Sequence, residues 1–224
     1  MKRTGWFLLV GFFIIAPWRF AFCAEHDFGK WEKAIVAFEE NDRTNPPPKH
    51  AVLFTGSSTI VRWKTLAQDF PNHRVINRGF GGSQIADAAH FADRIVIPYE
   101  PRMVFLRAGG NDIAAGKSPE QVFADYQEFV AKVHTKLPHT TIVFISLCPN
   151  VKRWANAEKE KSLNQMVEAY TRDKPYMEYI ETYSMSLGPD GKPRPELFID
   201  KLHFNAAGYE LLAESVRPYL PKSQ

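Results

Sequence analysis

Short apolar runs alternate along the chain with segments in which apolar residues recur every three or four positions. Runs of four to eight apolar residues bounded by turn residues are typical of buried strands, and the wider spacing is typical of amphipathic helices. Strands are predicted at 51–54, 74–77, 103–108, 141–146 and around 179–180. Because predicted helices separate these strands, the pattern indicates an α/β fold, a parallel sheet with helices on both faces.

Two of the predicted helices carry clear start signals. Ser118 is followed by Pro119 and, three positions after the serine, by Gln121, which predicts a capping box with proline at the first helical position. The apolar stripe of this helix runs from Val122 to Val133. Asn205 predicts the cap of a last helix in the same way.

Composition bounds the domain organisation. The 224 residues, 45% of them hydrophobic, suffice for one globular domain with a full core. A net charge of +3 without a long basic run gives no indication of a nucleic-acid partner. No linker is visible, so residues 24–224 are predicted to form a single domain; the oligomeric state is not predicted by these features.

The start of the chain predicts export. A basic opening, Met1-Lys2-Arg3, precedes an apolar stretch and small residues near position 23, the order found in secretory signal peptides. Cleavage after Cys23 would place Ala21 and Cys23 at the two small-residue positions. Residues 1–23 are therefore predicted to be a signal peptide and the mature protein to be periplasmic or secreted. The alternatives are a lipid on Cys23 or an uncleaved membrane anchor, although the uninterrupted apolar part is short for a span of about 20 residues.

Cysteine usage and metal motifs add only negative expectations. After the predicted cleavage Cys148 would stand alone, so no intramolecular disulfide is expected. Cys148 ends the apolar run 142–148, which predicts a buried, unreactive thiol. The chain contains no cysteine pair, His-Glu-x-x-His motif or acidic loop, so neither a metal nor a cofactor is expected.

Three predicted strands end in glycine followed by polar residues. The first leads into Gly56-Ser57-Ser58, the second into a glycine cluster that ends at Gly82, and the third into glycines and Asn111. Sites in open parallel sheets gather at the carboxyl ends of strands. Ser58 is therefore the candidate nucleophile, and backbone amides near Gly82 and the Asn111 side chain are candidate donors to an oxyanion. Each segment taken alone is better explained as a polar turn or cap, and only their combination points to a site.

A serine hydroxyl is a weak nucleophile and needs a positioned base. Among seven histidines, His203 differs because Asp200 precedes it by three residues, just before the predicted cap at Asn205. One turn of backbone can bring that carboxylate to the imidazole, which would fix the tautomer of the ring and stabilise its charged form. A local surface pair is the alternative interpretation.

Four motifs occur in order: Phe-x-Gly-x-Ser at 54–58, Asn-x-Gly-x-x-Gly at 77–82, Gly-x-Asn-Asp at 109–112 and Asp-x-x-His at 200–203. Each is weak alone, but together they resemble the SGNH hydrolases, also called GDSL-type esterases and lipases. The resemblance implies a flavodoxin-like three-layer α/β/α sandwich with a five-stranded parallel sheet.

The resemblance also implies roles for the matching positions. Ser58 would be the nucleophile, His203 the base and acid, and Asp200 the residue that orients the histidine. The oxyanion hole would consist of the backbone N–H groups of Ser58 and Gly82 and the side chain of Asn111.

One position departs from the common family pattern. Ser57 stands where many members carry aspartate, and this Gly-Ser-Ser variant resembles the small acetylhydrolases that act on platelet-activating factor and related bacterial proteins. The spacing from Gly56 favours Ser58 over Ser57 as the nucleophile, and the Ser57 hydroxyl is expected to hydrogen-bond locally. Asp112 is expected to support loop geometry.

These features predict an exported, metal-independent serine esterase that hydrolyses an acetyl or other short acyl ester of a glycan, a lipid or a small molecule. Trp63, Phe80 and Trp154 are candidate pocket walls, and Arg107 and Arg153 are candidate contacts for an anionic substrate.

Two rival functions remain open from the sequence. One is a non-catalytic acyl-sugar-binding protein on the same scaffold. The other is a flavodoxin-like nucleotide binder that uses residues 56–59 as a phosphate loop. The chain lacks the Walker lysine pattern and has Gln84 where a dinucleotide fingerprint needs its third glycine, which disfavours the nucleotide binder.

Overall fold

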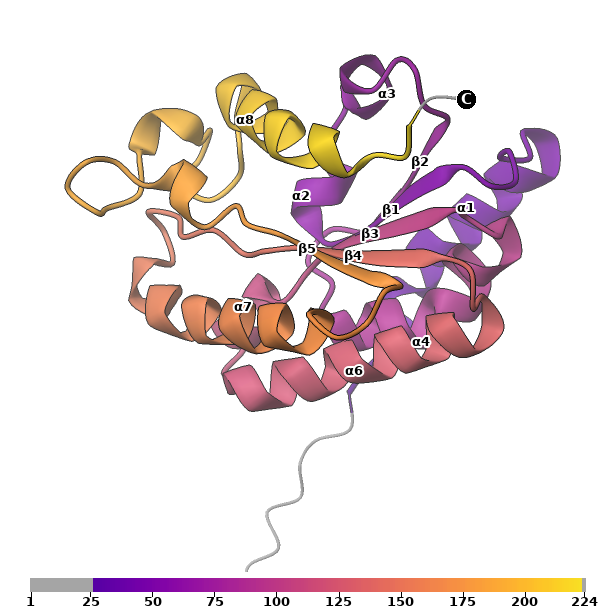
Figure 1. Ribbon diagram of the computed structural model, residues 1–224, viewed down its shortest axis with the longest axis horizontal. Coiled ribbons are helices and arrows are strands. Elements are labelled where there is room, and N and C mark those ends of the chain that lie inside the picture. The colour runs from indigo at the N-terminus through magenta and orange to yellow at the C-terminus, as the bar shows by residue number, and fades with distance from the viewer. Residues whose placement is uncertain (1–25, 223–224) are drawn as a thin grey trace, which may run out of the picture.

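The computed structural model describes residues 26–222, so the predicted signal peptide and Cys23 lie outside the described part. Five parallel strands form one sheet in the order β2-β1-β3-β4-β5 (Figure 1). The strands are β1 (Val52–Gly56), β2 (Val75–Gly79), β3 (Met103–Arg107), β4 (Thr141–Ile145) and β5 (Met177–Ile180). This arrangement confirms the five-stranded parallel sheet predicted above.

Helices cover both faces of the sheet, which completes the predicted α/β/α sandwich (Figure 1). One face carries α1 (Glu32–Thr44), α4 (Ile85–Ile95), α6 (Pro119–Lys136) and α7 (Ala157–Thr171); the other carries α2 (Ser58–Val61), α3 (Leu66–Asp69) and α8 (Ala206–Val216). A single turn, α5 (Gly110–Ala114), follows β3. Short 3-10 turns occur at 29–31, 97–99, 154–156, 184–186, 195–197 and 217–219.

The central strands are mostly apolar because both of their faces are covered. Leu106 and Phe144 pack in the cluster beneath α4, α6 and α7, whereas their neighbours Phe105 and Val143 pack in the cluster beneath α2, α3 and α8. All four side chains are fully buried. Burying one such side chain contributes about 1.5–3 kcal/mol, so the period-two alternation along each strand stabilises both helical layers at once.

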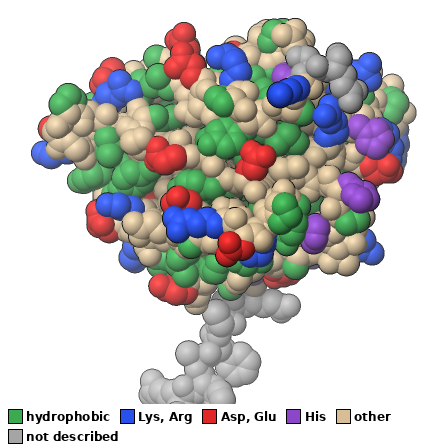
Figure 2. Space-filling model, in the orientation of Figure 1, with side chains coloured by type: hydrophobic (Ala, Val, Ile, Leu, Met, Phe, Trp, Pro, Cys, Tyr) green, Lys and Arg blue, Asp and Glu red, His purple; other side chains and the backbone are tan. Residues whose placement is uncertain are grey.

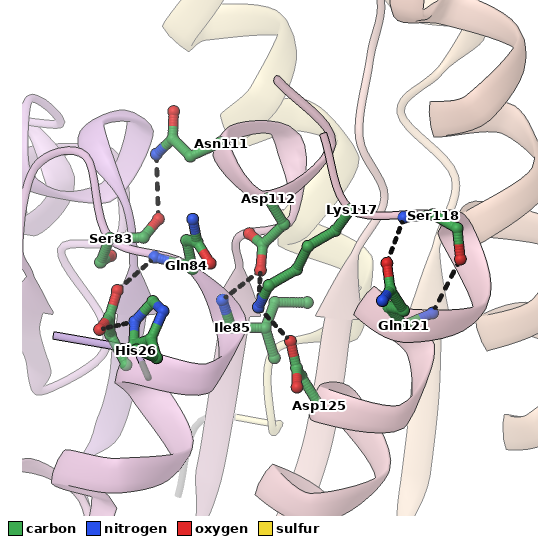
Figure 3. Close-up of polar contacts among 11 residues, drawn as sticks. His26, Ser83, Gln84, Ile85, Asn111, Asp112, Lys117, Ser118, Gln121 and Asp125 are labelled. Atoms are coloured by element: carbon green, nitrogen blue, oxygen red, sulfur yellow. Dashed lines mark hydrogen bonds and ion pairs between the residues drawn. The ribbon is translucent and has the colours of Figure 1, made fainter. Parts of the chain in front are cut away.

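The predicted capping signals hold in the structure. The Ser118 hydroxyl accepts a hydrogen bond from the Gln121 backbone at 3.3 Å, and the Gln121 side chain accepts one from the Ser118 backbone at 2.9 Å (Figure 3). Asn205 accepts from the Gly208 backbone at 3.1 Å. Helix α4 begins at Ile85, and the Gln84 backbone N–H donates to the Asp87 carboxylate at 2.7 Å, a cap that the apolar pattern does not reveal.

Strand order determines where a site can form. β2 and β3 pair with opposite sides of β1, so the connections from β1 and β2 lead away in opposite directions along the sheet. In open α/β sheets this reversal leaves a crevice at the carboxyl ends of the strands. Gly56-Ser57-Ser58 lies at this point, directly after β1.

Candidate active site

A sharp turn after β1 positions Ser58. Gly56 has φ of +129°, and a Cβ atom at this residue would lie 2.1 Å from the backbone oxygen of Arg107. The Ser57 backbone N–H donates to the same oxygen at 3.1 Å. Only glycine fits both the torsion angle and the close approach of β3. The chain therefore leaves the sheet at a fixed angle, and Ser58 becomes the first residue of α2.

A compact loop holds Asp200 and His203 together. Phe198 and Phe204 pair as an isolated antiparallel bridge at its base, and Lys201 at its tip has φ of +67°. One oxygen of the Asp200 carboxylate accepts from the His203 backbone N–H at 2.8 Å, and the other lies 2.7 Å from His203 Nδ1.

These bonds decide the chemistry of the Asp200–His203 pair. The His203 ring and then the His203 backbone N–H hold the pKa of Asp200 far below its ordinary value, so the carboxylate is ionised at neutral pH. An ionised carboxylate against Nδ1 favours the proton on that nitrogen. The opposite nitrogen, Nε2, is then left as the proton acceptor of a neutral imidazole.

Ser58 and His203, 145 positions apart in sequence, line the same hollow of about 60 Å³. The Asn111 side chain lines it as well, whereas Asp200 and Gly82 do not. The structure thus brings together Ser58, His203 and Asn111, with Asp200 bonded behind the histidine.

Asn111 is held at both ends of its carboxamide. Its Nδ2 donates to the backbone oxygen of Ser83 at 2.9 Å, and its Oδ1 accepts from Arg153 Nη1 at 3.0 Å. Figure 3 shows the bond to Ser83, which joins the loop after β3 to the loop after β2. Gly82 is the neighbour of Ser83 and has φ of +83°, so Asn111 is tied to the turn that contains the predicted Gly82 donor.

Asp112 connects α5 to the start of α4 beneath the surface, in agreement with its expected supporting role. Its Oδ1 accepts from the Ile85 backbone at 3.1 Å and lies 3.6 Å from Lys117 Nζ (Figure 3). Burial raises the pKa of Asp112 to about 6, although Lys117 opposes the shift.

Buried charges surround the deep side of the hollow. The Arg107 side chain is 5% exposed and donates to Cys148 Sγ at 3.0 Å, to Thr182 Oγ1 at 3.1 Å and to the backbone oxygen of Ser146. Cys148 is buried as predicted, and burial raises the pKa of its thiol. Arg107 and Arg153 both line the hollow, but both are engaged by protein groups.

Glu160 is the site residue that sequence reasoning missed. It is 2% exposed, lines the hollow, and has one carboxylate oxygen without a hydrogen bond among the described residues. Burial raises its pKa to about 8 against the opposing charges of Arg107 and Arg153. Glu160 stands in the charged run 158–161, which is typical of a solvated helix face. Its spacing from Leu163 and Val167 was the available signal that it faces inward.

The predicted aromatic walls are wrong. Trp63 and Phe80 are buried in the two hydrophobic clusters on opposite faces of the sheet, and Trp154 is 40% exposed. None of the three lines the hollow. Its aromatic residues are Phe198 and Phe204, whose rings stack 5.3 Å apart at the base of the His203 loop. The Ser57 hydroxyl was expected to hydrogen-bond locally, but it makes no capping hydrogen bond to α2.

Within residues 26–222 no group of three or more acidic, histidine or cysteine side chains is arranged to hold a metal ion. Over the same residues no helix has the length and apolarity needed to cross a bilayer.

Known proteins share both the sequence pattern and the fold. The model of the GDSL-like Lipase/Acylhydrolase family matches residues 49–211. A Streptococcus pneumonia protein named for platelet activating factor has a TM-score of 0.77 and 22% identity, covering 86% of this chain and 94% of its own. A GDSL-like lipase from Bacteroides thetaiotaomicron has a TM-score of 0.70 and 18% identity, covering 86% and 96%.

A third solved structure is a catalytic serine-to-alanine mutant of an acetylxylan esterase from Geobacillus stearothermophilus. It has a TM-score of 0.61 and 14% identity, covering 76% of this chain and 94% of its own. At these identities the three structures show the shared fold. A comparison with curated protein sequences found no match. The family match spans most of the chain, including all four motifs, so the chain belongs to the GDSL-like lipase/acylhydrolase family and is a carboxylic ester hydrolase.

Proposed function

We propose that the protein is a serine esterase that removes a short acyl group, such as acetyl, from a glycan, a lipid or a small molecule. The observation that carries the proposal is the placement of Ser58 and His203 in one small hollow, with Asp200 on the far nitrogen of the histidine. A nucleophile, a base and a group that orients the base are the parts that acyl transfer through serine requires.

The proposed reaction has two halves. Ser58 Oγ attacks the ester carbonyl while His203 Nε2 takes the hydroxyl proton, and the histidine then returns that proton to the departing alcohol. In the second half, His203 takes a proton from water as the water attacks the acyl-enzyme. The histidine then returns that proton to Ser58 Oγ as the bond between the acyl carbon and Oγ breaks and the acid leaves. Asp200 keeps the ring orientation through Nδ1 and stabilises the imidazolium in both halves.

The negative charge that develops on the carbonyl oxygen needs donors already in place. We assign this role to the backbone N–H groups of Ser58 and Gly82 and to Asn111 Nδ2. Ser58 supplies its N–H as the first residue of α2, where helical N–H groups lack an intrahelical partner. One hydrogen of Nδ2 is used by the Ser83 carbonyl, and the second remains for the substrate.

The size and polarity of the hollow favour a short acyl group. Its volume is about 60 Å³, and the Arg107 guanidinium and the Glu160 carboxyl group contribute polar atoms to its wall. Each methylene gains about 0.8 kcal/mol only when it leaves water for an apolar surface, and a polar wall provides little of this gain. The acetylxylan esterase neighbour is consistent with an acetylated sugar as one substrate class.

A panel of chromogenic esters with acyl chains of increasing length tests this function. The wild type should hydrolyse the acetate ester fastest, and Ser58→Ala should abolish the activity. Ser57→Ala is the matched control and should retain most of it. Equal rates for wild type and Ser58→Ala would refute the nucleophile, and tight binding of an acetylated sugar without turnover would favour the binding protein.

Export remains part of the proposal because of the basic and apolar opening of the sequence. N-terminal sequencing of the protein purified from its native cells should find a start at or near residue 24. A start at residue 1, or material bound to the membrane, would favour the anchor.

A further inference from the structure

We propose that Arg153 is a positioning residue: it holds the Asn111 carboxamide so that a nitrogen, and not an oxygen, faces the developing oxyanion. The inference rests on the proposed function of the same site and adds a residue that none of the four motifs contains. It starts from the two hydrogen bonds at the ends of the Asn111 side chain.

The two bonds determine the orientation of the amide without ambiguity. The backbone oxygen of Ser83 can only accept, so the Asn111 atom 2.9 Å away must be the nitrogen. The Arg153 guanidinium can only donate, so the atom 3.0 Å from its Nη1 must be the oxygen. A flipped carboxamide would set oxygen against oxygen at Ser83 and N–H against N–H at Arg153.

Arg153 is well placed for this task because both its main chain and its side chain are anchored. Its backbone N–H donates to Asn150 Oδ1 at 2.9 Å, and Asn150 is buried. The same Nη1 atom donates to the backbone oxygen of Gly110 at 3.1 Å. The guanidinium therefore contacts two consecutive residues at the start of α5. These contacts hold the backbone next to Asn111 as well as the Asn111 side chain.

The loop that carries Arg153 also touches the histidine loop. The backbone N–H of Lys152 donates to the backbone oxygen of Lys201 at 2.9 Å, between Asp200 and His203 in sequence. A single segment after β4 thus contacts both the residue proposed to bind the oxyanion and the loop that carries the proposed base. The carboxylate of Glu160 lies under the same turn, since a Cβ atom at Gly110 would lie 3.7 Å from its Oε1.

The expected role follows from electrostatics. Without Arg153, the Asn111 side chain would keep one anchor and could present its oxygen to the substrate, where it would repel the developing charge. A cation hydrogen-bonded to Oδ1 also draws electron density from the amide and strengthens the N–H as a donor. Both effects act on the transition state, so loss of Arg153 should lower kcat more than it raises KM.

A double-mutant cycle on the full chain tests the proposal. Arg153→Met should lower kcat for the acetate ester by about 10-fold to 100-fold, part of the 10²–10³-fold that removal of a whole oxyanion donor costs. In an Asn111→Ala background the same change should lower kcat by no more than about threefold, because residues that act through one another are not additive. Arg153→Lys keeps one charged donor and should recover part of the loss.

Arg172→Met is the matched control. Arg172 is exposed, and its guanidinium contacts Glu168 near the C-terminal end of α7, whereas Arg153 precedes the N-terminal end of that helix. This variant should keep wild-type kcat and KM. Circular dichroism of every variant establishes folding. If Arg153→Met does not fold, Arg153→Lys in the two backgrounds provides the cycle.

Three results would overturn the inference while leaving the proposed function intact: an equal fold-change from Arg153→Met in both backgrounds, no change in either, or a loss confined to KM. The third would mean that Arg153 binds substrate directly. Wild-type activity in Ser58→Ala would instead remove the proposed function, and the inference would fall with it.

Discussion

The two edges of the sheet carry hollows of opposite character. At the amino ends of the strands a wide hollow of about 1160 Å³ is lined by exposed basic side chains, namely those of Lys49, His50, Arg102, Lys136 and His139. Figure 2 shows Lys, Arg and His side chains gathered at this end of the molecule, on the right in that view and close to the C-terminal segment. At the carboxyl ends the hollow is about 60 Å³, and the ionisable side chains of Arg107 and Glu160 in its wall are buried.

The difference teaches that cavity size is a poor guide to chemistry in this fold. At the amino edge, Lys49 pairs with Glu100 at 2.6 Å while both side chains stay about half exposed, so water and salt screen the pair. At the carboxyl edge, the side chains of Arg107 and Glu160 are buried away from water. Such groups cost several kcal/mol when they are not satisfied, so this edge departs from the most stable arrangement. Departures of this kind are expected where the chemistry takes place.

Substituting a histidine at each edge should give the largest difference in kcat between the two edges. His203→Ala should lower kcat for the acetate ester by about 10⁴-fold, because Ser58 would lose its base. His139→Ala at the amino edge should leave kcat within about twofold of wild type, as expected of an exposed residue. Steady-state hydrolysis measures both, and a larger loss from His139→Ala would reverse the assignment of the two edges.

Substituting an asparagine at each edge should give the next largest difference in kcat. Asn111→Ala removes a proposed oxyanion donor and should lower kcat by about 10²–10³-fold with little change in KM. Asn72→Ala, at an exposed position on the amino edge, should have no effect on either constant. If Asn111→Ala raised KM alone, Asn111 would bind the ground state and the oxyanion would be stabilised elsewhere.

Glycine substitutions test how tightly the carboxyl edge is built. Gly56→Ala combines a positive φ with a Cβ atom 2.1 Å from the Arg107 backbone, and should lower the free energy of unfolding by about 3 kcal/mol or more. Gly116→Ala also has a positive φ, +100°, but has no atom within 4 Å, and should cost about 1 kcal/mol. Urea denaturation compares the two. Similar costs would show that the backbone angle, and not the contact with β3, makes Gly56 necessary.

The effect of Glu160 should appear in the pH dependence of stability. Its pKa rises from an ordinary 4.5 to about 8 in the folded protein, so between these values the native state binds more protons than the unfolded state. Stability should therefore fall as the pH rises through this window, by at most about 1.4 kcal/mol per unit from this group, and level off above it. Glu160→Gln should remove this slope.

Glu100 provides the matched comparison at the amino edge. Lys49 lowers the pKa of Glu100, so its contribution to stability is present above its ordinary pKa and lost only in acid. Glu100→Gln should therefore leave the slope between pH 5 and 8 unchanged. Urea denaturation midpoints of the wild type and both variants, measured between pH 5 and 8, give these slopes. If Glu160→Gln kept the wild-type slope, Glu160 would not be a neutral buried carboxyl at neutral pH.

Sequence patterns predicted the features that local physics determines. The apolar runs found all five strands, and the box at Ser118 placed the start of α6 correctly because both bonds of that cap lie within four residues. Ser58, His203 and Asn111, which the structure places around one hollow, were predicted because each belongs to a motif at a strand or helix end.

Features that depend on packing between distant segments were not predictable in the same way. Trp63 and Phe80 look like pocket walls in sequence, but the sheet buries them in its cores. Glu160 sits among charged neighbours and faces inward only because of its helical phase. The bond from Arg153 to Asn111 joins loops 42 residues apart, and no local pattern encodes it.

The central claim is that Ser58 is a nucleophile activated by His203, and covalent labelling tests it most directly. A fluorophosphonate probe should form one adduct, which peptide mass spectrometry should map to Ser58. Labelling should be lost in Ser58→Ala, retained in Ser57→Ala and slowed by orders of magnitude in His203→Ala. An adduct on another residue, or labelling of Ser58 at the wild-type rate without His203, would contradict the account.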